Sequence, residues 1–150
     1  MNKLLRGSFA GFAGTGLMTV VMAAERQAHL FRRPAPAEVT EQAEKKLNLR
    51  QHLSEPAFQA SWLGAHFGFG ISFGAGYALV RPLLPDSPIL AGLIWGGGIW
   101  ATSYLGVLPA LGLHPSPDDD SRSRTAVMIA THAIYGITTA IVERRLAPRK

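Results

Sequence analysis

Several ionisable or phenolic side chains lie inside, or directly beside, long uncharged runs of this sequence. Such groups are costly to place in a membrane interior, so by default they are candidates for a functional site. His66 lies about nine residues into one run and His132 about seven into another; at ~1.5 Å of helix rise per residue, both reach a layer roughly 10–14 Å below the same membrane boundary. We predict that this layer contains Glu25, His29, His66, Tyr104, His132 and Tyr135.

Three interpretations of this layer are open. In the first, which we favour, the polar side chains and Thr131 form hydrogen bonds between helices and fix their register, so that no cofactor is bound. In the second, His66 and His132 on facing helices supply both axial ligands of haem b, and neighbouring glycines make room for the macrocycle. In the third, Glu25, His29 and the two histidines exchange protons along a path for protons or small solutes.

The sequence offers little for catalysis. It contains no cysteine, which excludes disulfides, iron–sulfur clusters and cysteine-bound zinc. No Gly-x-Ser-x-Gly, Gly-x-x-x-x-Gly-Lys or His-Glu-x-x-His motif is present. His114 with residues 118–120, all Asp, has no recognised metal-ligand spacing, and we expect these residues to lie in a solvated loop that caps a helix. We therefore predict no catalytic residue, no metal site and no enzyme activity.

Four hydrophobic runs must position the polar layer. The 25 charged residues are almost absent from these runs and crowd the segments between them. At ~1.5 Å per residue, a helix over residues 57–80 is long enough to cross a hydrocarbon core of ~30 Å. The first run is longer and richer in glycine than a secretory signal peptide, so we expect it to be retained. The sequence predicts a single all-α domain over residues 1–150, a four-helix transmembrane bundle with spans at about 4–24, 57–80, 89–113 and 125–142.

Glycines at four-residue spacing predict close packing between these helices, either within one chain or between copies of it. Small residues at this spacing allow the backbones of membrane helices to approach closely. Pro109, near the end of the third span, is expected to kink its last turns or to end it early. The predicted packing glycines are Gly7, Gly11, Gly64, Gly68, Gly70, Gly74, Gly92 and Gly96.

Residues 25–56 form the one long polar segment. Its composition and the pair Glu41 and Lys45, at i,i+4 spacing, are typical of a surface helix. Val39, Ala43 and Leu47 make a thin apolar stripe, which favours an amphipathic helix lying on the lipid headgroups; a solvated linker helix is the alternative. Further along the chain, Ser121 or Ser123 is expected to cap the fourth span.

The net charge of +5 and the pI near 10.1 raise the question of which anionic partner the protein contacts. The basic residues cluster beside the hydrophobic ends, so we expect them to contact anionic lipids; no basic stripe with interleaved aromatic residues points to nucleic acid. The expected partners are the bilayer and a second copy or another membrane protein. Lysine and arginine counts on the two sides barely differ, and the basic C-terminus favours cytoplasmic termini in the inner membrane.

The chain resembles the YagU-like family of uncharacterised bacterial inner-membrane proteins. The similarity lies in the first span, in Arg33-Pro34-Ala35-Pro36-Ala37-Glu38-Val39-Thr40, in the glycine-rich second span with His66, and in His132-Ala133-Ile134-Tyr135-Gly136. The resemblance implies a small four-helix inner-membrane protein without an assigned biochemical role, and it supplies no catalytic residue.

Two functions follow as expectations. The first is a structural or interaction component of the membrane, with residues 25–56 facing a partner. The second is a cofactor-binding or transport protein that uses His66 and His132.

Overall fold

The computed structural model describes residues 1–27 and 33–148, and within them it contains helices and no strand. Four helices are long and apolar enough to cross a membrane: α1 (Lys3–Gln27), α3 (Glu55–Val80, extended by the short helix η2, Arg81–Leu83), α4 (Pro88–Trp100, extended to Ala110) and α6 (Arg122–Leu146). The predicted all-α bundle with four apolar spans is confirmed, and the chain has the architecture of a helical membrane protein.

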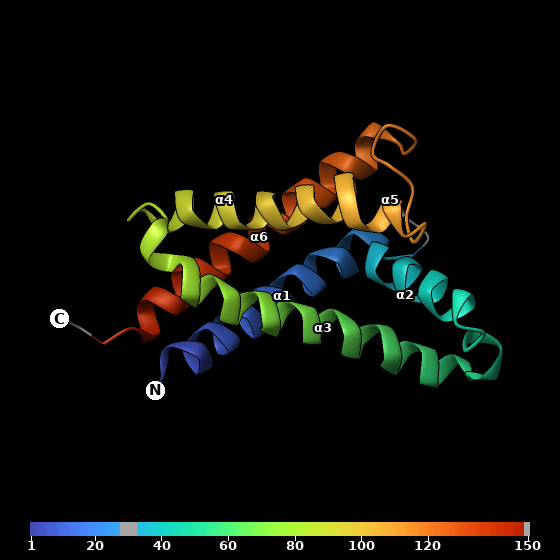
Figure 1. Ribbon diagram of the computed structural model, residues 1–150, viewed down its shortest axis with the longest axis horizontal. Coiled ribbons are helices and arrows are strands. Elements are labelled where there is room, and N and C mark those ends of the chain that lie inside the picture. Colours follow the sequence, from blue (N-terminus) through green and yellow to red (C-terminus); the bar gives the residue numbers. More distant parts are fainter. Residues whose placement is uncertain (28–32, 149–150) are drawn as a thin grey trace.

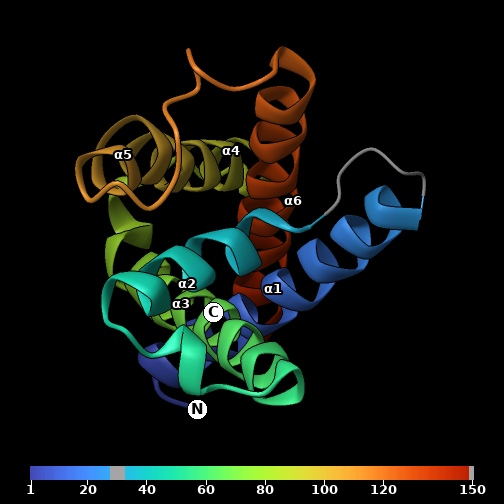
Figure 2. The ribbon, with the colours of Figure 1, turned by 90° about the vertical axis from the view of Figure 1, so that its right-hand side faces the viewer.

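The four long helices pack in the order α3, α1, α6, α4, with each neighbour antiparallel to the next (Figure 1). The outer helices α3 and α4 meet at the end that holds both termini, and they diverge towards the other end. The shorter helix α2 (Ala35–Lys46) lies across this second end, as Figure 2 shows from that side. This divergence leaves room for the candidate site between α3 and α4.

Glycines bring the neighbouring helices together at all three interfaces; between α1 and α6, a Cβ added at Gly14 would lie 2.9 Å from the carbonyl oxygen of Tyr135. A Cβ atom added at Gly7 or Gly11 of α1 would overlap the carbonyl oxygens of Gly74 and Gly70 of α3. At the interface of α4 and α6, a Cβ added at Gly92, Gly96 or Gly136 would likewise overlap the backbone of the facing helix. The backbones therefore touch directly, as small residues allow in membranes.

Gly64 and Gly68 differ from the other predicted packing glycines. Both lie on an outward face of α3, and a Cβ added at either would meet no described atom within 4 Å. Their expected packing against another helix is therefore not found within this chain. The four-residue spacing is the same as at Gly70 and Gly74, and only the rotation of α3 about its axis separates the two faces.

The third span is less regular than the sequence predicts. After α4, residues Ala101–Val107 form the π-helical segment η3, and the one-turn helix α5 (Leu108–Ala110) follows. Proline lacks an N–H and its ring collides with the carbonyl four residues earlier, so Pro109 disturbs the preceding turn. The span ends at Ala110 rather than at residue 113, because Gly112 (φ 60°) reverses the chain and Leu113 N donates to Leu108 O at 2.9 Å.

Serines begin the later spans. Ser54, Ser87 and Ser121 accept hydrogen bonds from the backbone N–H groups of Ala57, Leu90 and Arg124. The predicted cap of the fourth span is thus Ser121, and that helix continues past the predicted end at residue 142 to Leu146.

The polar segment folds as α2 and the 3₁₀ turn η1 (Arg50–His52), but its buried face differs from the prediction. Ala37 and Glu44 are buried, whereas Leu47 is 67% exposed. The reason is that α2 ends at Lys46 and Asn48 adopts a positive φ of 56°, which takes Leu47 out of the helical stripe. The face that packs on α3 instead joins Ala37 to Phe58 and Trp62.

Candidate functional site

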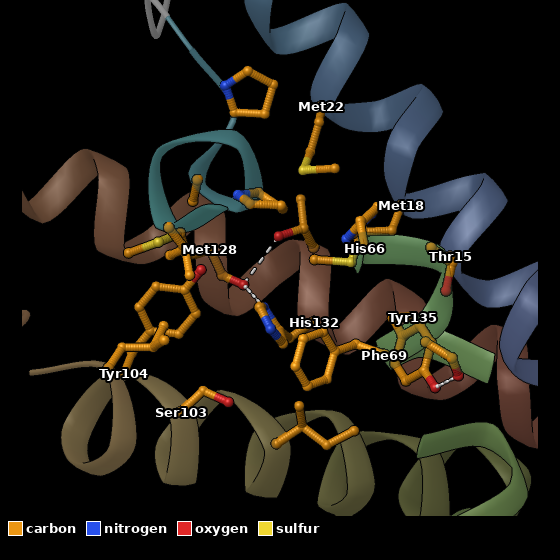
Figure 3. A pocket seen from close by; sticks show the side chains of 18 of the residues that line it. Thr15, Met18, Met22, His66, Phe69, Ser103, Tyr104, Met128, His132 and Tyr135 are labelled. Carbon is orange, nitrogen blue, oxygen red and sulfur yellow. Dashed lines mark hydrogen bonds between the residues drawn. The ribbon is translucent and has the colours of Figure 1, made fainter. Parts of the chain in front are cut away.

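A cavity of about 630 Å³ lies between the diverging halves of α3 and α4. Helices α1 and α6 form its floor, and the start of α2 borders it at the open end of the bundle (Figure 3). Most of its wall is apolar, with Phe69 and Phe73 from α3 and Trp95 and Ile99 from α4. The site is thus a hydrophobic cavity inside a membrane bundle.

Five of the six residues predicted for the polar layer line this cavity. They come from four different segments: Glu25 from α1, His66 from α3, Tyr104 from η3, and His132 and Tyr135 from α6. His29 lies outside the described residues. Residues up to 110 positions apart in the chain therefore meet at one cavity, because the helix rise places them at a similar depth in the bundle.

Several further residues, which the sequence does not predict for the site, also line the cavity, among them Trp95, Ser103 and Met128. A helical spacing could have found Met128, because it lies one turn before His132 on the same face of α6. Ser103 lies within η3, where the π-helical geometry changes which residues share a face, so no α-helical spacing predicts it.

His132 is held in one orientation by its own helix. Its Nδ1 lies 2.8 Å from the carbonyl oxygen of Met128. A carbonyl oxygen only accepts hydrogen bonds, so Nδ1 carries the proton and Nε2 carries the free lone pair. The ring of Tyr104 packs edge-on against the imidazole, at 5.7 Å between centroids and 84° between planes. In its neutral form, the imidazole therefore presents Nε2 as an acceptor.

His66 presents a second imidazole from the facing helix. Its Nε2 is buried and has no hydrogen-bond partner among the described residues. The ring packs between aromatic neighbours, with centroids 6.4 Å from Trp62 and 5.9 Å from Phe67. The indole Nε1 of Trp95, another lining residue, is also buried without a partner in the described chain. Two polar atoms at the cavity thus lack the hydrogen bonds that buried groups normally make.

Tyr135 differs from the histidines because its hydroxyl is satisfied. The hydroxyl donates to the carbonyl oxygen of Gly70 at 2.7 Å and so links α6 to α3 (Figure 3). Thr131 turns back onto its own helix, where its hydroxyl lies 3.0 Å from the carbonyl oxygen of Met128. Of these polar side chains, Tyr135 alone makes the hydrogen bond between helices that the first interpretation expects of the layer.

Ion pairs hold α2 over the mouth of the cavity. Glu38 of α2 pairs with Arg124 at the start of α6, and Arg124 also lies 3.4 Å from Asp120. On the other side, the Ser61 hydroxyl of α3 donates to Glu44 at 2.5 Å. Helix α2 is therefore bound to α6 and to α3, the two helices that carry the histidines.

His114 lies close to the site. The prediction that it lies in a solvated loop is wrong. His114 is only 6% exposed and packs edge-on against Tyr104, with 5.1 Å between ring centroids. Its Nδ1 lies 2.9 Å from the carbonyl oxygen of the next residue, Pro115. Asp118 and Asp119 are exposed, and the described residues contain no cluster of three His, Cys, Asp or Glu side chains that could hold a metal ion.

Comparison with known proteins gives one match. No curated protein and no solved structure matches the chain. The resemblance to the YagU-like family stays a prediction. A family model, described as "Family of unknown function (DUF6789)", matches residues 1–150, and the chain therefore belongs to this family.

Proposed function

We propose that the protein binds a small lipid-soluble molecule in the cavity between α3 and α4. One observation carries this proposal: an apolar cavity of about 630 Å³ is lined by His66 and Trp95, and the Nε2 atom of the first and the Nε1 atom of the second are buried without partners in the described chain. Ligand sites in proteins typically measure about 300–1,000 Å³ and combine apolar walls with a few polar groups that fix orientation.

The unpartnered atoms favour a ligand over a purely structural role. A buried donor or acceptor without a hydrogen bond costs about 1–3 kcal/mol. A bound molecule with a complementary polar group removes this cost. A bundle built only for packing would carry the cost of the unpartnered atom without compensation.

The cavity opens sideways rather than only towards water. Phe69 on α3 is 66% exposed and Ile94 on α4 is 48% exposed, yet both line the cavity. In a membrane, such residues face hydrocarbon. The ligand therefore enters from the bilayer between α3 and α4, and α2 closes the end towards the headgroups.

A pair of adjacent glycines tests this proposal. Both Gly97 and Gly98 have open space beyond Cα, but only Gly98 lines the cavity. We expect Gly98→Leu to fill the cavity and Gly97→Leu to leave it open. Native mass spectrometry of protein released from detergent measures the result: wild type and Gly97→Leu should carry a bound small molecule, and Gly98→Leu should not. Equal occupancy in the two variants, or none in the wild type, would contradict the proposal.

A second candidate is the structural or interaction component of the membrane. It is favoured by one outward face of α3, where Ala60, Gly64, Gly68 and Ser72 are all exposed at four-residue spacing. Because such faces associate in lipid, the partner would be a second copy or another membrane helix. Disulfide formation between copies that carry Gly68→Cys tests it, since the natural chain has no cysteine; Gly97→Cys is the control.

We also propose the bacterial inner membrane as the location, with both termini in the cytoplasm. The C-terminal Arg144 and Arg145, next to the end of the fourth span, support this orientation.

A further inference from the structure

The free nitrogens at the cavity favour one class of lipid-soluble ligand, and this inference rests on the function proposed above. We propose that the ligand is a haem-type iron porphyrin, bound through the imidazoles of His66 and His132 as its two axial ligands. Both side chains point into the cavity, one from α3 and the other from α6 (Figure 3).

The tautomer of His132 is that of a metal ligand. Its Nδ1–H is directed to the Met128 carbonyl oxygen at 2.8 Å, which leaves the lone pair on Nε2. Metal-binding histidines are oriented in this way by a carbonyl or carboxylate that accepts the other N–H. A ligand whose only polar group is a carbonyl, such as a quinone, could accept from the indole N–H of Trp95 but would leave this lone pair of His132 unused, whereas a metal would bind it.

His66 supplies the second nitrogen from α3, which forms one wall of the cavity. Its Nε2 is buried and unpartnered among the described residues, so a metal would satisfy an atom that the chain leaves unsatisfied. No carboxylate or cysteine joins the two imidazoles, and no cluster of three such metal-binding side chains exists in the described parts of the chain. A bare ion would thus lack ligands, whereas a porphyrin brings four nitrogens of its own and needs only two more.

The walls and the mouth suit the rest of the porphyrin. The cavity volume of about 630 Å³ and the open space beyond Gly98 in its wall leave room for a flat macrocycle between apolar side chains. At the end near α2, Arg26 lines the same cavity and could pair with the porphyrin carboxylates; Arg33 also lines it but already pairs with Glu41 at 2.9 Å. The ligand would therefore lie with its carboxylates towards the headgroups and its ring in the hydrocarbon layer.

The test is a haemin titration of the full-length protein in mild detergent, followed by dithionite reduction. We expect a Soret band that saturates at one haem per chain and the sharp reduced bands of two-imidazole coordination. His66→Ala and His132→Ala should each lose those bands and weaken haem binding by about tenfold or more. His52→Ala is the matched control, because His52 is exposed and does not line the cavity.

The outcomes separate this inference from the proposed function. A wild-type spectrum without two-imidazole bands, or unchanged bands in both histidine variants, would overturn the haem assignment. If native mass spectrometry still detects a different molecule that Gly98→Leu removes, the cavity binds a ligand but not haem. If it detects no molecule in any variant and haemin does not bind, both proposals fail. Size-exclusion profiles equal to that of wild type show that the variants remain folded.

Discussion

At the scale of single residues, the polar groups inside the bundle divide into those that the chain satisfies and those that it leaves open. The hydroxyl groups of Tyr135 and Tyr77 differ in this respect. The Tyr135 hydroxyl donates to Gly70 O at 2.7 Å, whereas the Tyr77 hydroxyl is buried without a partner among the described residues. Only the first hydroxyl therefore contributes a hydrogen bond between helices.

We expect Tyr135→Phe to lower the free energy of unfolding by about 0.6–1.7 kcal/mol, the range measured for hydrogen bonds between membrane helices. Tyr77→Phe removes a hydroxyl that makes no hydrogen bond among the described residues, so the stability of this variant should equal or exceed that of wild type. Reversible unfolding in mixed micelles with SDS measures both values. A larger loss for Tyr77→Phe than for Tyr135→Phe would refute this assignment.

A buried ion pair joins the two ends of the chain. Arg6 of α1 lies 2.8 Å from Glu143 of α6, and their side chains are only 15% and 4% exposed. Removing one member of a buried pair leaves the other charge unpaired, which costs about 3–5 kcal/mol. We expect Arg6→Met to cost that much and the double variant Arg6→Met/Glu143→Leu to recover most of it.

The same unfolding assay measures this effect, with Lys45→Met as control. Lys45 pairs with Glu41 at 3.2 Å but is 51% exposed, so its loss should cost less than about 1 kcal/mol. Equal losses for Arg6→Met and Lys45→Met would mean that the buried pair contributes no more than the surface pair.

At the scale of helices, the glycines of α3 divide between two faces. Gly74 touches Gly7 and Gly11 of α1, and Gly68 faces open space. We expect Gly74→Leu to force α1 and α3 apart and to cost about 1–3 kcal/mol or more. Gly68→Leu should leave the stability of the monomer unchanged. Thermal unfolding of the two variants in detergent distinguishes them, and equal transition temperatures would contradict this division.

The helices could be predicted from sequence better than their faces could. Uninterrupted apolar length determines a span, so the four runs were found with errors of only a few residues at their ends. The face that a helix turns to its neighbours depends on partners elsewhere in the chain. Gly64 and Gly70 thus have equivalent sequence patterns but different surroundings. In α2, Asn48 ends the helical pattern by its positive φ, which a stripe of apolar residues does not reveal.

The candidate site was predictable to the extent that it depends on depth. Helix rise places Glu25, His66 and His132 at one level, and all three line the cavity. The volume of the cavity follows instead from the divergence of α3 and α4, which is a property of the whole packing. The burial of His114 likewise depends on its packing against Tyr104, and nothing local in the sequence determines that.

At the scale of the whole molecule, an even number of spans places both termini and the turn at Ser87 on one side, with α2 on the other. The absence of cysteine makes this testable without removing any residue first. We expect Gln42→Cys and Asp86→Cys to react with a membrane-impermeant maleimide from opposite sides of the membrane. In intact cells with cytoplasmic termini, only Gln42→Cys should be labelled; labelling of both would contradict the four-span topology.

The order in which the helices pack also constrains how the chain is made. Helix α1 packs on α3 and on α6, and α4 packs mainly on α6, which follows it in the chain. Until α6 has entered the bilayer, the glycine face of α4 at Gly92 and Gly96 has only lipid beside it. Helix α4 therefore has no closely packed partner among the long helices until Arg122–Leu146 has been inserted beside it.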